Sequence, residues 1–417
     1  MVAELDRGRG LTRRLAKCLV DRRDRSKIEL TQLELLRQRI YGIVAGYEDG
    51  IDHNTLRADP MLKIAAERAP LSDRDLASQP TLSRFENGVT RRELIALAQA
   101  IVDDFVAGHR RKPPREIVLD FDATDDPTHG QQELEFYHGY YGRHCYLPLL
   151  VFASCDGGVQ EPIAGVLRPG NSGAARGVPG ILRRIVRTLA QAFPKASLVF
   201  RGDSGMAGPA TYEMAEKLGV LYTIGLATNE RLRKLAEPLV AQARREFEET
   251  GEKVRLFGEV LYQAETWDHP RRVVVKAEVI PSHPYETNVR YVVTNRTDLE
   301  AEQLYGFYVQ RGDPEKRIGE LKNGCRSGRT SCCSFLANQF RLLLHLAAYR
   351  LLVLFRMNLP NRELRVAQVE TLRWKLLKVA ALVTESVRRV LIHLADNYPW
   401  KDDWIAAAKV ARMGGIA

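Results

Sequence analysis

The chain has 417 residues, 45% of them hydrophobic, and carries 62 lysines and arginines against 52 acidic residues, a formal net charge of +10. This length predicts two or three domains with a sizeable buried core. The most apolar stretch, residues 342–355, is interrupted by His345 and Arg350 and is too short to span a bilayer, which excludes a membrane protein.

The compartment is predicted from the cysteines and from the first residues. The six cysteines form no Cys-x2-Cys pair and no zinc-binding pattern, which indicates reduced thiols in a cytoplasmic protein. Residues 1–25 are charged throughout, unlike a signal peptide.

The net charge is unevenly distributed along the chain. Residues 1–115 hold 22 basic and 17 acidic side chains, residues 116–320 hold 24 and 29, and residues 321–417 hold 16 and 6. An acidic middle between basic ends suits an enzyme that holds cations at its centre and DNA phosphates at its flanks. We therefore expect DNA as the partner, and a surface of solvated arginines is the alternative.

Residues 1–115 are the first predicted region, and they are all-α. Apolar residues recur at helical spacing over residues 11–20 and 31–47. Two prolines in residues 112–115 predict a linker at the end of this region.

One run in this region predicts contact with DNA. Residues 78–87 resemble the start of a recognition helix in helix-turn-helix proteins. Short hydroxyl side chains at Thr81 and Ser83 could approach base edges, and Arg84 could reach a guanine or a phosphate. The same run is also typical of an ordinary helix N-cap.

From residue 116 the pattern changes to strands. Strands are predicted over residues 117–122, 145–153, 162–168, 197–202 and 221–226, and helices over residues 176–193 and 211–218. Three antiparallel strands followed by alternating helix and strand predict an α/β domain, whose first part we place at residues 116–228.

Two of these strands end in aspartate. The alternation of residues 117–124 places Asp120 and Asp122 on one face, and a glycine-flanked turn after the next apolar strand exposes Asp203. Carboxylates that converge from separate elements are what two-metal phosphoryl transfer requires.

Residues 229–298 form a predicted insertion. A long charged helix runs to about residue 251, and residues 255–295 then turn β-rich. Trp267 lies between two of the strands and could stack on a base expelled from a DNA duplex. An interior packing role is the commoner one for tryptophan.

Residues 299–330 complete the α/β domain and contain a third acid. Tyr308, Arg311, Glu315 and Lys322 are spaced by 3, 4 and 7 residues, the offsets of one helix face. Such a face could hold a metal ion through the glutamate and DNA phosphates through the cations. Residues 312–314, Gly-Asp-Pro, predict an interruption of this helix.

Residues 331–417 are predicted to be a helical, basic C-terminal region. Helices are expected over residues 335–356 and 372–394. Just before them, Arg326 and Arg329 lie in a small, basic loop and are candidate contacts to the DNA strand.

Together these residues resemble the DDE transposases of bacterial insertion sequences, in the group with a Tyr-x2-Arg-x3-Glu-x6-Lys signature. Tyr308, Arg311, Glu315 and Lys322 fit this spacing without a gap, and Asp203 resembles the second acid. The resemblance covers about residues 115–395 and implies a ribonuclease H-like catalytic domain with a β-rich insertion.

The first acid has two candidates. Asp122 is followed by Ala-Thr, as the resemblance implies for the first catalytic aspartate, whereas Asp120 is followed by Phe121. We therefore favour Asp122. Asp125, Asp126 and His129 are nearby and could orient the metal ligands through hydrogen bonds.

The resemblance implies a bacterial, nucleoid-associated enzyme with Asp122, Asp203 and Glu315 as catalytic metal ligands for two Mg²⁺ ions, which Mn²⁺ could replace. The enzyme would bind the terminal inverted repeats of the element and target DNA as a homodimer, cleave the ends and join them to the target. A metal-dependent nuclease or resolvase, and a non-catalytic DNA-binding protein derived from a transposase, are the alternatives.

Overall fold

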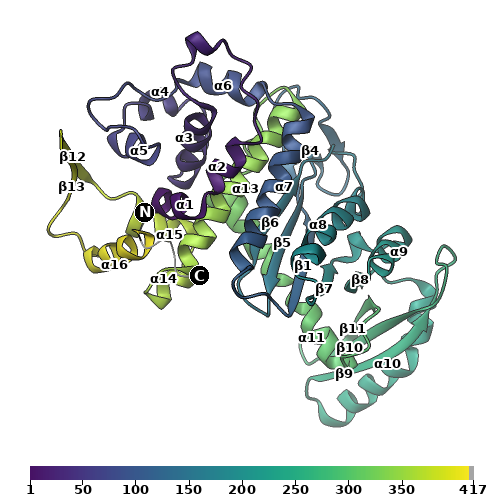
Figure 1. The fold of residues 1–417 in the computed structure, drawn as a ribbon. Coiled ribbons are helices and arrows are strands. Elements are labelled where there is room, and N and C mark those ends of the chain that lie inside the picture. Colours follow the sequence, from purple (N-terminus) through teal and green to yellow (C-terminus); the bar gives the residue numbers. More distant parts are fainter. Residues whose placement is uncertain (413–417) are drawn as a thin grey trace.

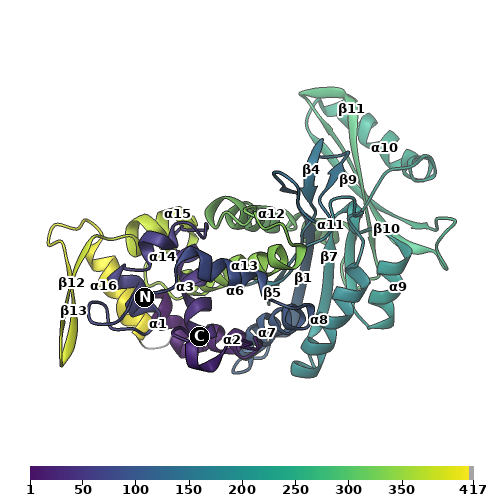
Figure 2. The ribbon, with the colours of Figure 1, turned by 90° about the horizontal axis from the view of Figure 1, so that it is seen from above.

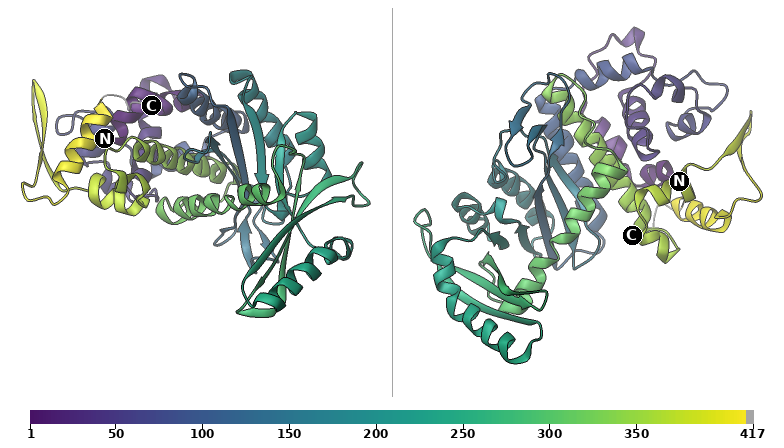
Figure 3. Two further views of the ribbon diagram at one scale, coloured as in Figure 1. Left: turned by 90° about the horizontal axis from the view of Figure 1, so that it is seen from below. Right: turned by 180° about the vertical axis from the view of Figure 1, so that it is seen from behind.

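The computed structural model describes residues 1–412 as a large sheet beside a helical part (Figure 1). Helices from both ends of the chain gather around the long helix α13 (Phe335–Met357), and the sheet with its covering helices extends away from them (Figure 2). Views from below and from behind show the same division (Figure 3). Within the described residues, no helix combines the length and apolar character needed to cross a membrane.

The large sheet has eight strands in the order β6-β5-β1-β7-β8-β11-β10-β9. β1 is antiparallel to β5 and parallel to β7, which is parallel to β8. β8 is antiparallel to β11, so the β-rich residues continue the same mixed sheet. The strands are β1 (Glu116–Ala123), β5 (Leu149–Cys155), β6 (Glu161–Val166), β7 (Ser197–Gly202), β8 (Leu221–Leu226), β9 (Val254–Tyr262), β10 (Arg271–Ile280) and β11 (His283–Thr294).

The predicted α/β fold class is confirmed as far as this large mixed sheet. The strand expected over residues 145–153 is divided at Pro148 into β4 (Arg143–Tyr146) and β5. β4 pairs with β2 (Asp126–Pro127) and β3 (Phe136–His138) in a separate small sheet. A proline lacks the N–H group that a strand interior requires, which explains the division.

The strand alternation fixes which face of the sheet each helix covers. Ile117, Leu119 and Phe121 of β1 pack into the core beneath α7, α8 and α9, whereas Leu150 and Phe152 of β5 pack against α13. Asp120 and Asp122 therefore belong to the face opposite α8. The other helices of the sheet are α7 (Arg91–His109), α8 (Val178–Ala192), α9 (Pro209–Lys217), α10 (Glu230–Thr250) and α11 (Ala301–Val309).

The helix that carries the spaced motif is interrupted, as predicted. α11 ends at Val309, and α12 (Gly312–Gly319) begins after two turn residues. α12 continues into a π-helical turn, η3 (Glu320–Gly324). Leu304 anchors α11 to Val274 and Val292 of the sheet, which positions the rest of the motif.

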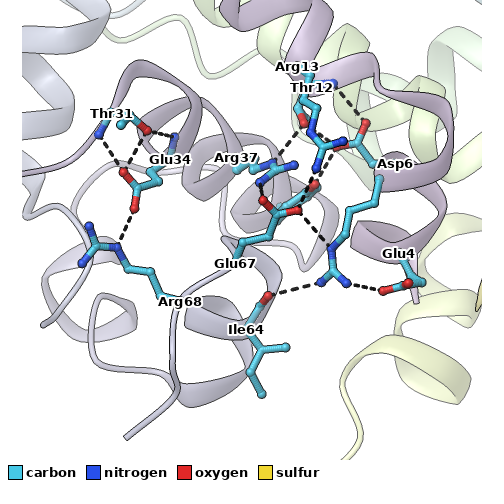
Figure 4. A network of polar contacts seen from close by, with 12 residues as sticks. Glu4, Asp6, Thr12, Arg13, Thr31, Glu34, Arg37, Ile64, Glu67 and Arg68 are labelled. Carbon is cyan, nitrogen blue, oxygen red and sulfur yellow. Dashed lines mark hydrogen bonds and ion pairs between the residues drawn. The ribbon is translucent and has the colours of Figure 1, made fainter. Parts of the chain in front are cut away.

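The N-terminal helices are held together by charged side chains as well as apolar ones. Nη1 of Arg37 lies 2.7 Å from Glu67, and Nε of Arg68 donates to Glu34 at 2.6 Å (Figure 4). Glu86 of α6 accepts from Arg341 of α13 at 2.7 Å. These helices are α1 (Val2–Arg9), α2 (Leu11–Ala16), α3 (Gln32–Val44), α4 (His53–Leu56), α5 (Pro60–Ala65) and α6 (Gln79–Asn87).

The helix predicted over residues 372–394 is wrong. A π-helical turn ends at Leu377, and β12 (Ala381–Ser386) and β13 (Arg389–Leu394) then form a two-stranded hairpin. Val383, Thr384, Val390 and Ile392 are β-branched, and such side chains favour extended backbone over helix. The remaining helices of this region are α14 (Arg362–Val366), α15 (Val369–Leu372) and α16 (Lys401–Arg412).

Candidate active site

Two aspartates lie side by side at one edge of the sheet. β1 and β7 run parallel, and their register pairs Phe121 with Gly202. Asp122 is the next residue of β1, and Asp203 directly follows the last residue of β7. Neighbouring strands of a sheet lie about 4.8 Å apart. The structure thus brings together two acids that are 81 positions apart in the chain.

Asp120, the other candidate for the first acid, has a different environment. Its Oδ2 accepts hydrogen bonds from Nη2 of Arg201 and Nε2 of Gln160, both at 2.9 Å. Arg201 also donates to the carbonyl oxygen of Phe307 in α11 at 2.7 Å. Asp120 is therefore part of a buried bridge between the sheet and α11, and Asp122 is the aspartate of β1 that faces Asp203.

Glu315 of α12 is linked to this pair through Arg311. Nη2 of Arg311 lies 3.1 Å from Oε1 of Glu315, and its Nη1 lies 3.8 Å from Oδ2 of Asp122. The side chain of Glu315 is 60% exposed, whereas that of Asp122 is 12% exposed. All three predicted acids therefore meet at one place, with the guanidinium group of Arg311 between two of them.

The charge balance of this cluster is unfavourable for ionised carboxylates. Burial raises the pKa of Asp122 to about 7, with repulsion from Asp203 and Glu315 adding to the shift and Arg311 opposing it. Oδ1 of Asp203 is buried and has no hydrogen-bond partner among the described residues. Hard divalent cations prefer such oxygen ligands. The chemistry of these residues therefore fits the predicted divalent metal, and Asp122, Asp203 and Glu315 are the candidate ligands.

Tyr308 lies between Arg311 and the turn after Asp203. The guanidinium carbon of Arg311 is 5.9 Å from the centre of its ring. A Cβ atom added to Gly225 of β8 would lie 2.4 Å from the hydroxyl of Tyr308 and 3.0 Å from the amide nitrogen of Ser204. Sequence reasoning missed Gly225, although a lone glycine inside a strand is a known sign of close backbone approach.

Lys322 contacts the segment that follows Asp122. Its Nζ donates to Oγ1 of Thr124 at 3.1 Å, to the carbonyl of Asp125 at 2.7 Å and to Oδ1 of Asp125 at 2.8 Å. These bonds join η3 to the end of β1. Lys322 and Asp125 thus lie beside the acids, while His129 lies in an exposed loop.

Asp126 holds the basic loop that follows η3. Its Oδ2 accepts from Oγ1 of Thr330 at 3.0 Å, and burial raises its pKa to about 7. The candidate DNA contacts of this loop, Arg326 and Arg329, are each more than half exposed. Nη1 of Arg326 also lies 3.0 Å from Oε1 of Glu48, so the loop is paired with the N-terminal part.

The candidate contacts Thr81, Ser83 and Arg84 lie on α6, which is hydrogen-bonded to α13 through Glu86 and Arg341. Arg84 is exposed, and Thr81 and Ser83 are half-buried. Thr81 and Arg84 line a cavity of about 840 Å³. α5 ends at Ala65, far before α6 begins, whereas only three residues separate α6 from α7. α6 is therefore the first helix of a pair joined by a short turn, whereas a recognition helix is the second helix of such a pair.

Trp267 lies in the core. It is 7% exposed, and its ring packs edge to face against Tyr212 and Tyr262, with Arg271 above it. The interior packing that the sequence analysis set against base stacking is thus the arrangement in this structure. Base stacking by Trp267 has no support here.

A second group of potential metal ligands lies outside the acid cluster. Glu216, Asp268 and His269 bring oxygen and nitrogen atoms within 4.8 Å of one another. Arg271 already lies 2.9 Å from Oδ1 of Asp268 and donates to Oε2 of Glu216 at 2.8 Å. A guanidinium group therefore contacts both of these carboxylates directly, whereas that of Arg311 lies 3.8 Å from Asp122.

Comparison with known proteins identifies the class of this chain. Residues 1–414 match the family model described as "Transposase DDE domain group 1". The chain is a transposase of the DDE class. It belongs to the transposase DDE domain group 1 family.

The other comparisons add little to this assignment. Among solved structures, "Mos1 transposase paired-end complex with left transposon end" is similar at 14% identity and a TM-score of 0.18, over 49% of this chain and 62% of that chain. The match thus spans less than two thirds of that protein. No curated protein sequence matches the chain.

Proposed function

We propose that this transposase cleaves the ends of a DNA element by metal-dependent phosphodiester hydrolysis and joins the freed 3′ ends to target DNA. The observation that carries the proposal is the placement of Asp122 beside Asp203 at the ends of two parallel strands, with the charge of Glu315 acting on Asp122. The order β6-β5-β1-β7-β8, antiparallel and then parallel, supports the ribonuclease H-like core that the resemblance implied.

Asp122, Asp203 and Glu315 would hold the metal ions. Bound Mg²⁺ or Mn²⁺ supplies the positive charge that activates a nucleophile and stabilises the leaving oxygen. Asp122 and Asp203 are fixed by the sheet, and Glu315 is carried by a separate helix, so the acids approach the phosphate from two sides. Rigid placement of two ligands favours a defined geometry at the reacting phosphorus.

Arg311 and Tyr308 would position the DNA strand. Arg311 pairs with Asp122 and Glu315 in this structure. Once these acids bind cations, its guanidinium group loses both partners and can form bidentate hydrogen bonds with a phosphate. Tyr308, whose hydroxyl lies over Gly225 beside the Asp203 turn, would contact the strand end, and Lys322 would add charge from the opposite side.

These placements suggest a role for each region of the chain. We assign end binding to residues 1–115, catalysis to residues 116–228 and 299–330, an inserted subdomain to residues 229–298, and further DNA contacts to the basic residues 331–417. Two copies would pair two element ends as a homodimer on DNA. The six free cysteines agree with action on bacterial chromosomal DNA in the cytoplasm.

The test is cleavage of a labelled duplex that carries a candidate element end, with Mg²⁺ or with EDTA. Glu315→Gln should abolish metal-dependent cutting at the element boundary, because it removes one ligand charge. Glu302→Gln, an exposed glutamate on α11, is the matched control and should cut like the wild type. Cutting that ignores the end sequence would favour a nuclease, and binding without cutting in the wild type would favour a non-catalytic DNA-binding protein.

A further inference from the structure

One helix of the catalytic part presents a row of arginines to solvent. Arg183, Arg184 and Arg187 of α8 are exposed, and Arg176 is exposed in the loop before the helix. Leu182, Ile185, Val186 and Leu189 of the same helix pack against the sheet. We call the four exposed residues the α8 arginine row. At 1.5 Å per residue the helix rises about 14 Å from Val178 to Arg187, and Arg176 lies before its first turn.

The α8 arginine row has no balancing charge. α8 contains no acidic residue, and the structure shows no ion pair or hydrogen bond for these four guanidinium groups within residues 1–412. By contrast, Arg350 and Arg356 are buried and ion-paired. Like charges four residues apart, as at Arg183 and Arg187, destabilise a helix. An anionic partner outside the chain would remove this cost.

The row begins at the edge of the sheet where the acids lie. Arg168, which is buried, donates to the carbonyl oxygens of Ala174 at 2.6 Å and of Arg176 at 3.0 Å, and so fixes the loop before α8. A Cβ atom added to Gly205 would lie 2.8 Å from Cβ of Ala174 and 3.1 Å from Oδ1 of Asp203. The loop that carries Arg176 therefore adjoins the active site.

We propose that the α8 arginine row binds the phosphate backbone of target DNA. Its partner is a polyanion, because one strand of duplex DNA places a phosphate every 3.4 Å along the axis, about four along the helix from Val178 to Arg187. Contacts between arginines and phosphates do not distinguish one base sequence from another. Such contacts suit a target DNA without a fixed sequence better than the defined sequence of an element end.

The position of the row also separates the two DNA molecules that must meet at the acids. Tyr308, Arg311 and Lys322 lie with α11, α12 and η3 on the face of Asp122, whereas α8 covers the opposite face. The element end would occupy the first face, and the target would reach the same edge from the second. This inference rests on the proposed function.

The experiment measures joining of a pre-cut element end, with its free 3′-hydroxyl, to a supercoiled plasmid by the full chain. Arg183→Gln, Arg184→Gln and Arg187→Gln are combined in one variant. Lys217→Gln, Lys234→Gln and Arg245→Gln form a control with the same change in charge at exposed sites on other helices. End cleavage and thermal unfolding are measured in parallel.

The α8 variant should lower the ratio of joining to cleavage by about tenfold or more, and the control variant should not. It should also reduce the salt dependence of plasmid binding, by a slope of about 0.9 per lost phosphate contact. Joining equal to that of the control overturns the proposal, and an equal fall in cleavage reassigns the row to the element's own DNA. If the wild type neither cleaves nor joins, the proposed function fails. In that case plasmid binding still tests the row: a salt slope of the α8 variant equal to that of the wild type would overturn the proposal that the row binds DNA.

Discussion

At the scale of single residues, the site is dominated by the burial of a carboxylate, Asp122, beside other carboxylates. Asp122 is buried beside Asp203, and the nearest positive charge, that of Arg311, is shared with Glu315. The acids were predictable because each ends an apolar strand or lies in a spaced motif. The choice between Asp120 and Asp122 needed the register of β1 and β7, and Gly225 became visible only through the hydroxyl of Tyr308.

The raised pKa of Asp122 predicts how stability depends on pH without divalent ions. Between about pH 4 and 7 the folded chain holds a proton that the unfolded chain has released, so the free energy of unfolding falls as the pH rises. Asp122→Asn removes this loss. The variant should be more stable than the wild type above pH 7, by up to about 4 kcal/mol, and the difference should shrink towards pH 4.

Urea unfolding between pH 4 and 8 measures this difference. Asp396→Asn, at an exposed position in the C-terminal part, is the control and should follow the wild type at every pH. Parallel curves for Asp122→Asn and the wild type would show that the pKa of Asp122 is not raised in the folded chain.

Gly225 predicts a second effect at this scale. Gly225→Ala would push the hydroxyl of Tyr308 away from its place beside Ser204. Because a misplacement of about 1 Å at an active site can cost about 100-fold in rate, end cleavage should fall by about tenfold to a hundredfold. Gly306→Ala, on α11 with no atoms near the added methyl group, should cleave like the wild type. Equal rates for both variants would exclude a role for the Tyr308 position.

At the scale of elements, the helix that carries Glu315 is held by a buried acid that follows it. Oε1 of Glu320 in η3 lies 2.6 Å from Nη1 of Arg356, and its Oε2 accepts from the hydroxyl of Tyr349 at 2.6 Å. Oε2 also lies 3.1 Å from Nη1 of Arg317 in α12. Glu320 thus joins α12 to α13, and it was not distinguished by the spaced motif.

Removing the charge of Glu320 should destabilise the contact between α12 and α13. Glu320→Gln leaves the buried guanidinium group of Arg356 without its counter-charge, which costs about 3 kcal/mol or more of the free energy of unfolding. Cleavage by the folded variant should fall because Glu315 loses its fixed position. Chemical unfolding and single-turnover cleavage test this, with Glu363→Gln, an exposed glutamate of α14, as the control. A free energy of unfolding equal to that of the wild type would show that Glu320 does not stabilise the packing of α12 against α13.

Elements could be predicted where periodicity and burial agree. β1, α8 and α13 have long apolar patterns that pack into cores, and the sequence predicted all three. The β12–β13 hairpin was predicted as a helix, yet its apolar residues Leu382, Val390 and Leu391 are exposed and pack into no core. The sequence did not show that α6 precedes, rather than follows, a three-residue turn. Its position depends on packing against α13, which no local sequence pattern reveals.

At the scale of the whole molecule, the two ends of the chain share a core with the catalytic part. Leu11, Ile40 and Leu97 from the N-terminal helices belong to the same apolar cluster as Leu351 of α13 and Phe152 of β5. Charged groups reinforce this connection. Arg350 of α13 donates to Asp104 of α7 at 2.8 Å and to Glu161 of β6 at 2.9 Å.

This shared core predicts that the catalytic part does not fold alone. A chain of residues 116–417 would expose the face of α13 that α3 and α7 cover, so it should aggregate or unfold non-cooperatively. Circular dichroism and thermal unfolding of the fragment and of the full chain measure this. A fragment that unfolds cooperatively near the melting temperature of the full chain would show that the N-terminal helices are an independent domain.

The most direct measurement of the central claim compares end cleavage by Asp122→Asn and Asp120→Asn, each normalised to its folded fraction. We predict that Asp122→Asn is folded, stable and inactive with Mg²⁺, because it lacks a metal ligand. Asp120→Asn should lose stability, because Arg201 loses its counter-charge, yet retain cleavage in the molecules that remain folded. Cleavage at the wild-type rate by Asp122→Asn, or loss of cleavage only in Asp120→Asn, would contradict the assignment of Asp122 and Asp203 as the paired catalytic acids.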